Sequence, residues 1–266
     1  MSFSYNAVWE DTTKLLRQHA PLLAAIAGVF MFLPALLFAV LLPPPEPQGG
    51  DPARMVQLMM TFYRAAWPWF LLQGLFSIVG TLAMLRLVFA RGTTVGGALV
   101  HALKLTPFYI LLSILFGLAV SIALLVIILP AILLGPAAIV LAALILIVPL
   151  LYLIGRIAPV PAVMVAENRR NPIDALGRTF ALTRGHGWAI IGLVLIIVIV
   201  AGIAVGMADT LAGLVFILAA GQALGKLLAS VVAAALNAAF ATLLVMLYAA
   251  IYRALAGTSS VAAAFE

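Results

Sequence analysis

Polar side chains that lie deep inside apolar stretches are the residues of this chain best placed to do chemistry. Gln73 and Ser77 stand four residues apart in one such stretch, and Asn237 stands in another. Amide and hydroxyl groups can bind a polar solute or a lipid headgroup if the helices that carry them enclose a cavity. The same side chains also serve ordinary helix packing, which is their commoner use. We therefore favour helix packing, and the alternative is a polar cavity lined by Gln73, Ser77 and Asn237.

Residues with catalytic or metal-binding chemistry are scarce. The chain has three histidines, His19, His101 and His186, and no cysteine. Three imidazoles could hold zinc, but no carboxylate is placed to orient them, so we predict no metal site and no cofactor. The motifs G-x-S-x-G and H-E-x-x-H are also absent from the sequence. We predict that the protein is not an enzyme, and the weaker alternative is an unfamiliar site around Arg156, Glu167 and His186.

The composition indicates the environment of these residues. The 266 residues are 66% hydrophobic and only 8% charged, whereas soluble chains are about 45–50% apolar and about 25% charged. So few polar groups could not cover the surface of a soluble fold of this size. The composition therefore excludes a soluble globular domain and a disordered chain, and it predicts a protein that lies in lipid.

Six stretches are long enough to cross a membrane as helices. Such a helix needs about 20 mainly apolar residues to span about 30 Å of hydrocarbon. Segment 211–225 is also apolar, but it is short and rich in glycine, so we predict that it is interfacial or re-entrant. The six predicted spans are 21–42, 67–89, 107–134, 137–157, 188–207 and 227–251.

The basic residues predict the orientation in the membrane. Short loops rich in Lys and Arg stay in the cytoplasm, and six spans place 11 of the 14 basic residues on the side of both termini. We therefore predict a bacterial cytoplasmic (inner) membrane protein with both termini cytoplasmic. The net charge of +6 favours contact with anionic headgroups, and the lack of a basic soluble domain argues against nucleic-acid binding. The predicted lipid contacts are Lys14, Arg17, Arg169, Arg170, Arg178 and Arg184.

Amphipathic segments precede the first, third and fifth spans. At 5–18 and 94–105 apolar residues recur on one face, which is typical of helices that lie on a membrane surface. The third segment has the clearest signals, because Asn171 can cap a helix, the proline after it fits the first turn, and Asp174 suits the positive helix end. Asp174 and Arg178 are expected to pair across one helical turn.

The order of surface helix, span, outer turn and returning span recurs three times, which indicates an internal repeat. We predict an all-α integral membrane fold in a single membrane domain. Its six transmembrane helices form three parallel hairpin units, each preceded by an amphipathic helix on the cytoplasmic surface. The domain covers 1–266, and the repeats are expected at 1–91, 92–167 and 168–266.

Residues 156–188 carry a resemblance to a known family. The stretch reads RIAPVPAVMVAENRRNPIDALGRTFALTRGHGW, in which a proline-ended span is followed by an acidic residue and a P-x-x-A-L-x-x-S/T-x-x-L-T-x-G pattern. It resembles the membrane domain of the bacterial glycerophosphoryl diester phosphodiesterase family, which implies a six-helix inner-membrane module that some relatives fuse to a hydrolase. The H-R-G start and acidic metal ligands of that hydrolase are missing from this sequence, so the resemblance does not extend to its activity. The matching residues are Glu167, Pro172, Ala175, Leu176, Thr179, Leu182, Thr183, Gly185 and Trp188.

Together these features favour a multi-pass inner-membrane protein with a structural or accessory role, which organises lipid or a partner membrane complex. The alternative is a transporter or a lipid-handling subunit with a polar cavity among its helices. The expected partners are membrane lipids, with anionic headgroups at the cytoplasmic face, and another membrane protein or a second copy of the chain.

Overall fold

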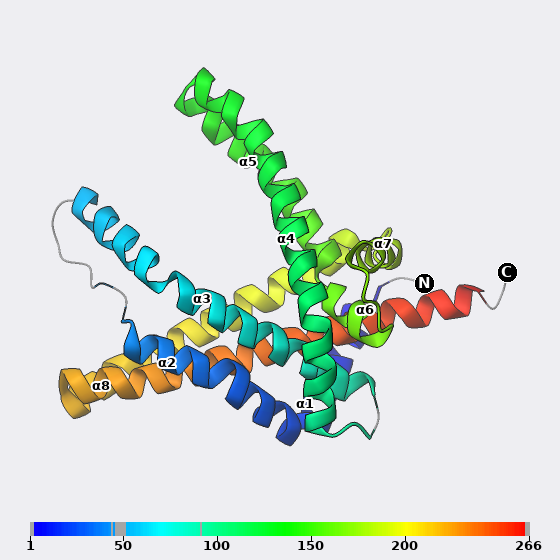
Figure 1. Cartoon of the computed structure of the whole chain (residues 1–266), viewed down its shortest axis with the longest axis horizontal. Coiled ribbons are helices and arrows are strands. Elements are labelled where there is room, and N and C mark those ends of the chain that lie inside the picture. The colour runs from blue at the N-terminus through cyan, green and yellow to red at the C-terminus, as the bar shows by residue number, and fades with distance from the viewer. Residues whose placement is uncertain (1–2, 44, 46–51, 91, 264–266) are drawn as a thin grey trace.

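The computed structural model describes residues 3–43, 45, 52–90 and 92–263. All secondary structure in these residues is helical, which confirms the all-α prediction. The N-terminal end of α1 and the C-terminal end of α8 lie on the same side of the molecule (Figure 1). Asp11 of the first helix pairs with Arg253 of the last at 3.2 Å. The elements are α1 (Tyr5–Ala27), η1 (Gly28–Phe32), α2 (Leu33–Leu41), α3 (Pro52–Phe89), α4 (Val95–Leu134), α5 (Pro136–Ile157), α6 (Val160–Ala166), α7 (Pro172–Leu182) and α8 (Gly187–Ala263).

The first three elements form one uninterrupted helical segment. Pro21 lies inside α1, where its missing N–H removes a helix hydrogen bond and bends the axis. The blue ribbon changes direction within α1 (Figure 1). The predicted surface helix at 5–18 is therefore not a separate element, because the proline bends the helix without ending it. Residues 28–32 continue the same segment as a π-helix.

The second predicted surface helix is also part of a longer one. Thr94 caps α4, because its hydroxyl oxygen accepts a hydrogen bond from the backbone N–H of Gly97 at 3.2 Å. The helix then continues without a break to Leu134, so residues 94–105 are not a separate surface helix. Two adjacent glycines at its start lower helix propensity, but they remain helical within this longer element. Gly135, at φ 103°, makes the tight turn into α5.

The third predicted surface helix is a separate element, α7. Asn171 caps it by accepting a hydrogen bond from the backbone N–H of Ile173 at 3.0 Å, and Asp174 lies in its first turn. Arg178 does not make the predicted pair with Asp174 but pairs with Glu167 at 3.0 Å. The packing of α7 on α6 brings Arg178 to the end of α6, where the half-buried carboxylate of Glu167 accepts its hydrogen bond.

Helix α8 consists of two arms, 187–220 and 222–263, that meet at Gly221. Gly221 has φ 78° and ψ 177°, a backbone conformation that is open almost only to glycine. The arms fold back closely on each other, since a Cβ at Gly225 would lie 2.5 Å from the Cα of Ile217. Segment 211–225, predicted to be interfacial or re-entrant, forms the tip of this hairpin and is helical on both sides of the turn.

Five helices in the described part of the chain are long and apolar enough to cross a membrane. This finding fits a multi-pass membrane protein. One of the five is Gly187–Gly257, which contains both arms of α8. The six predicted spans correspond to these helices only if each arm crosses by itself.

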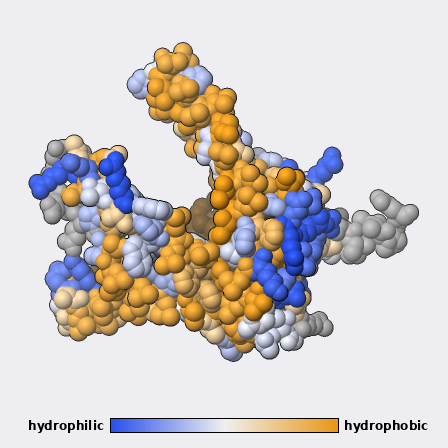
Figure 2. Space-filling view, in the orientation of Figure 1, coloured by the Kyte–Doolittle hydropathy of each residue, from blue (hydrophilic) through white to orange (hydrophobic). Residues whose placement is uncertain are grey.

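The buried core lies toward the end of the molecule that carries both termini. Leu15 of α1, Leu85 of α3, Val163 of α6 and Leu247 of α8 are at most 2% exposed and belong to one cluster. The pair α4 and α5 projects away from this core (Figure 1), and the surface of this pair is almost entirely apolar (Figure 2). Leu133 near its tip is 85% exposed. Apolar surface on this scale is unfavourable in water and favourable in lipid.

Candidate functional site

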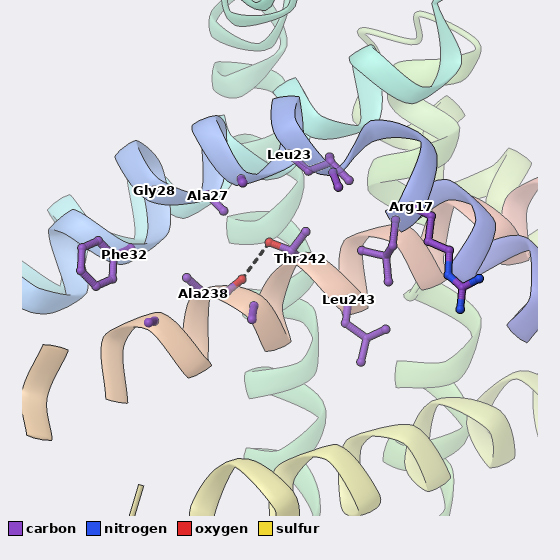
Figure 3. Close-up of a pocket in the computed structure, with 13 residues that line it drawn as sticks. Arg17, Leu23, Ala27, Gly28, Phe32, Ala238, Thr242 and Leu243 are labelled. Carbon is purple, nitrogen blue, oxygen red and sulfur yellow. Dashed lines mark hydrogen bonds between the residues drawn. The ribbon is translucent and has the colours of Figure 1, made fainter. Parts of the chain in front are cut away.

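A groove opens between α1 with η1 and the second arm of α8 (Figure 3). Its volume is about 630 Å³, within the range of about 300–1,000 Å³ typical of small-molecule sites. Arg17 lies at one end of the groove and Phe32 at the other (Figure 3). The lining residues are Leu16, Arg17, Ala20, Leu23, Ala24, Ala27, Gly28, Phe32, Ala235, Ala238, Ala239, Thr242 and Leu243.

Small residues on both helices produce the groove. On α1, Ala20, Ala24 and Ala27 recur at three- and four-residue spacing, so they share one face of the helix. On the second arm of α8, Ala235 and Ala239 do the same. Alanine side chains fill little of the space between two helices, so a groove remains where the two alanine faces meet.

The interior of the groove is apolar. Thr242 carries the only hydroxyl group among the lining residues, and its Oγ1 donates a hydrogen bond to the carbonyl oxygen of Ala238 at 2.8 Å. Beyond Arg17, the apolar part of the groove extends from Ala20 on α1 to Phe32 on η1, which is about 18 Å at 1.5 Å per residue. One leaflet contributes about 15 Å of the hydrocarbon thickness of a bilayer. The groove therefore suits an apolar chain whose anionic head lies near the exposed guanidinium of Arg17.

The π-helix η1 separates the groove from a second pocket. Gly28 and Phe32 line the groove, whereas Phe30 and Met31 line the pocket beside it. A π-helix turns less per residue than an α-helix and so changes the direction of its side chains, and such turns are frequent at functional sites. No local residue pattern predicted this element.

The structure places Gln73, Ser77 and Asn237 around this second pocket, which has a volume of about 260 Å³. Gln73 and Ser77 come from α3, and Asn237 comes from the second arm of α8. The side-chain amide of Asn237 donates a hydrogen bond to the carbonyl oxygen of Ala233 at 2.8 Å. Ala238 lines both the pocket and the groove. The pocket thus offers amide and hydroxyl groups directly beside an apolar groove, in a space that suits a small polar group.

Comparison with known proteins does not assign this geometry to a family: no family model, no curated protein and no solved structure matches the chain. The function of the groove and the pocket is therefore argued from their own residues.

The residues that carry the family resemblance have structural roles in α7. Ala175, Thr179 and Thr183 form a face of the helix that is at most 1% exposed. The hydroxyl of Thr179 donates to the carbonyl oxygen of Ala175 at 2.7 Å, so burial leaves it satisfied. Gly185 follows the helix at φ 79°, a conformation that favours glycine. The pattern thus describes how α7 packs and ends.

Glu167 is the centre of a charged cluster between α6, α7 and α8. Its carboxylate accepts hydrogen bonds from Arg169 at 2.6 Å and Arg178 at 3.0 Å, and the hydroxyl of Tyr252 donates to it at 3.4 Å. Burial alone would raise the pKa of Glu167, but the hydrogen bonds and positive charges of the two arginines outweigh burial and lower that pKa below its ordinary value. The carboxylate is therefore held ionised as a structural acceptor.

The weaker hypothesis of a catalytic site is not supported by the contacts of its three residues. Each of Arg156, Glu167 and His186 contacts different residues. The guanidinium of Arg156 donates to Thr183 Oγ1 at 3.2 Å and lies 4.6 Å from the ring centroid of Phe180. The ring of His186 lies beside that of Phe3, with 6.2 Å between the centroids. Arg156 therefore joins α5 to α7, and the three residues do not share a common pocket among those described.

The three histidines also lie apart from one another. His19 Nδ1 is 3.2 Å from the carbonyl oxygen of Leu15, and His186 Nδ1 is 3.2 Å from that of Arg184. Within the described residues, no group of three or more His, Asp or Glu side chains could hold a metal ion.

The six predicted lipid contacts fall into two groups. Arg169 and Arg178 are engaged with Glu167. The other four side chains are exposed and have no acidic partner within the described residues, so they are free to meet headgroups. These four are Lys14, Arg17, Arg170 and Arg184.

The α1 side of the groove was not predicted from the sequence. On the sixth predicted span the sequence analysis singled out Asn237, which lines the neighbouring pocket. The signal for the groove was the spacing of Ala20, Ala24, Ala27 and Gly28 around the start of the first predicted span, but spacing does not reveal which helix faces this row of small residues.

Proposed function

We propose that this chain is a multi-pass membrane protein that organises lipid by holding an apolar chain of an anionic lipid in the groove between α1 and α8. The observation that carries the proposal is the chemistry of the groove: about 630 Å³ of apolar space with Arg17 at one end. The role is one of binding, because the groove offers apolar walls and one cation and no set of groups suited to acid–base or nucleophilic chemistry.

In this proposal each arm of α8 crosses the membrane by itself, which makes six crossings in three hairpins. The hairpins are α2 with α3, α4 with α5, and the two arms of α8. The exposed basic residues near both termini support a cytoplasmic position for this side. The resemblance of residues 156–188 supports the inner membrane of a bacterium as the location.

Filling the groove tests the proposal. Ala24 and Ala239 are exposed lining residues on opposite walls, so phenylalanine at either position should occupy the groove without disturbing the core. We expect Ala24→Phe and Ala239→Phe to retain several-fold less phosphatidylglycerol than the unchanged protein in native mass spectrometry after detergent extraction. Ala143→Phe is the matched control, since Ala143 is an exposed residue of α5 outside the groove.

If Ala24→Phe and Ala239→Phe retained as much lipid as Ala143→Phe and the unchanged protein, the groove would not be the lipid site. That result would favour the second candidate, a transporter or lipid-handling subunit that works through the polar pocket. The observation behind this candidate is the meeting of Gln73, Ser77 and Asn237 around one space of about 260 Å³. Polar side chains at membrane depth are costly and are commonly kept for function.

A further inference from the structure

A cavity of about 540 Å³ lies where the end of α2 meets the hairpin of α8. Three of its lining residues are polar: Asp209 on the first arm of α8, and Lys226 and Ser230 on the second arm. The other described lining residues are apolar. The cavity therefore presents one acidic and one basic side chain to the same space, unlike the groove between α1 and α8.

The two charged residues of this cavity do not neutralise each other. Asp209 lies twelve residues before the turn at Gly221, and Lys226 lies five residues after it. At 1.5 Å per residue, their positions along the hairpin differ by about 10 Å, whereas an ion pair needs a separation of about 4 Å. The half-buried carboxylate of Asp209 forms no ion pair with a described residue. A ligand that carries both charges can therefore bridge the two side chains.

The cavity lies about one bilayer thickness from the start of α8. Asp209 follows Trp188 by 21 residues, which is about 32 Å at 1.5 Å per residue. The hydrocarbon core of a bilayer is about 30 Å thick, and tryptophan side chains prefer its edges. With Trp188 at the cytoplasmic edge, Asp209 lies at the height of the headgroups of the opposite leaflet. This placement rests on the proposed crossing of the first arm of α8, but it does not depend on the groove.

The polar groups of the cavity favour a ligand with both a cation and an anion. The carboxylate of Asp209 accepts N–H donors, and so can the hydroxyl oxygen of Ser230, whose hydrogen is donated to the carbonyl oxygen of Lys226 at 2.9 Å. The ammonium of Lys226 has three N–H donors and is a compact positive charge that suits a phosphate. None of the described lining residues is aromatic, whereas quaternary ammonium groups are recognised by aromatic rings. The cavity thus favours a primary ammonium group together with a phosphate.

We propose that this cavity binds a phosphoethanolamine group, with its ammonium at Asp209 and Ser230 and its phosphate at Lys226. Such a group carries its two charges at opposite ends of a short chain, so it can bridge two charged side chains that do not pair directly. The group is carried by the headgroup of phosphatidylethanolamine or by soluble phosphoethanolamine. A choline headgroup has the same phosphate but no N–H donor, so the site distinguishes the two headgroups.

The test measures the binding of phosphatidylethanolamine and phosphatidylcholine with identical acyl chains to the full chain, by native mass spectrometry in detergent. We expect the unchanged protein to bind phosphatidylethanolamine several-fold more tightly. Asp209→Asn keeps the size of the side chain but removes its charge, so it should abolish this preference. Lys226→Gln should weaken the binding of both lipids several-fold, because both carry the phosphate.

Asp174→Asn and Lys104→Gln are the matched controls, since both residues are exposed and lie outside the cavity. Both controls should keep the preference for phosphatidylethanolamine. Ala24→Phe fills the groove and should also keep this preference, so the groove and the cavity are tested separately. Excess soluble phosphoethanolamine identifies the source of the group. If it displaces the lipid, the site accepts the soluble compound, and if it does not, the site requires the lipid.

Three results would overturn the site. The first is equal binding of the two lipids by the unchanged protein, a comparison that depends on no variant. The second is a preference that survives in Asp209→Asn, or one that the controls lose to the same extent. The third is undiminished binding of both lipids by Lys226→Gln.

Discussion

Glu167 makes side-chain contacts with three other residues at the end of α6. It accepts hydrogen bonds from Arg169 and Arg178 and lies 3.4 Å from the hydroxyl of Tyr252 on α8. One carboxylate thus connects the end of α6, the helix α7 and the last arm of α8. Its side chain is only 18% exposed, whereas those of the two arginines are 38% and 36% exposed. Solvent therefore weakens these ion pairs but does not abolish them.

Glu167→Gln should destabilise the protein by about 1 kcal/mol, because it removes the charge that both arginines meet and keeps the shape of the side chain. The midpoint of chemical unfolding in detergent measures this loss. Asp174→Asn is the control, since Asp174 forms no ion pair with a described residue, and its effect should be smaller. An equal loss in the two variants would contradict the role given to Glu167.

The lowered pKa of Glu167 also predicts how stability depends on pH. A carboxyl group whose pKa is lower in the folded state stabilises the fold above its unfolded pKa and loses that contribution as the pH falls through the folded value. The unfolded value is near 4.5. The stability difference between the unchanged protein and Glu167→Gln should therefore be constant near neutral pH and shrink below about pH 4.5. A difference that grows in acid would contradict this sign.

At the scale of elements, the turn of α8 shows how one residue sets the path of a helix. Three glycines lie in 211–225, but only Gly221 leaves the helical conformation, while Gly213 remains helical in open space and Gly225 permits close packing against Ile217. The hairpin therefore depends on the backbone freedom of Gly221 and on the small size of Gly225.

Gly221→Ala should destabilise the protein by about 1–3 kcal/mol, since φ 78° with ψ 177° is strained for any residue with a Cβ. Gly213→Ala is the matched control within the same segment and should be neutral or stabilising by up to about 1 kcal/mol. Thermal unfolding of the two variants in the same detergent distinguishes them. A loss of stability in Gly213→Ala as large as in Gly221→Ala would contradict the assignment of the turn.

The elements that could be predicted from the sequence are those with local signals. Helix α7 was predicted with its cap because Asn171, the proline after it and Asp174 act within a single turn. The segments 5–18 and 94–105 were predicted to be separate, yet both continue into longer helices. Their C-terminal ends carry no capping signal, and a proline inside a membrane helix can bend it without ending it.

The π-helix η1 and the groove depend on contacts between distant parts of the chain. Gln73, Ser77 and Asn237 could be chosen from the sequence because a polar residue in an apolar span is conspicuous by itself. The alanines of α1 are not conspicuous in a chain that is 66% hydrophobic. Their role becomes visible only when the second arm of α8 lies opposite them, as in Figure 3.

At the scale of the whole molecule, the core is concentrated at one end, and the helices diverge toward the other (Figure 1). Water would penalise the apolar surface of α4 and α5, but lipid accepts it (Figure 2). The termini and α7 lie at the packed end, and the turns at Gly135 and Gly221 lie at the diverging ends. In the proposed orientation, the packed end faces the cytoplasm and the diverging ends lie in and beyond the membrane.

The chain has no cysteine, so single cysteines can report this orientation without interference. In intact cells a membrane-impermeant maleimide should label Ala137→Cys and Gln222→Cys, which follow the turns at the diverging ends and are exposed. Arg184→Cys, at the end of α7, should be labelled only after permeabilisation. Labelling of Arg184→Cys in intact cells would show that the orientation is opposite to the proposed one. If Gln222→Cys alone were protected from labelling, the two arms of α8 would not cross the membrane separately.

The proposed function requires that a lipid chain lies in the groove between α1 and α8. The most direct measurement uses phosphatidylglycerol with a photoactivatable diazirine in one acyl chain, with the crosslinked residues mapped by mass spectrometry in the purified protein. We expect crosslinks to concentrate on Leu23 to Phe32 of α1 and η1 and on Ala235 to Leu243 of α8, and we expect Ala24→Phe to remove them. Crosslinks spread evenly over the exposed surface of α4 and α5, with no excess at the groove, would contradict it.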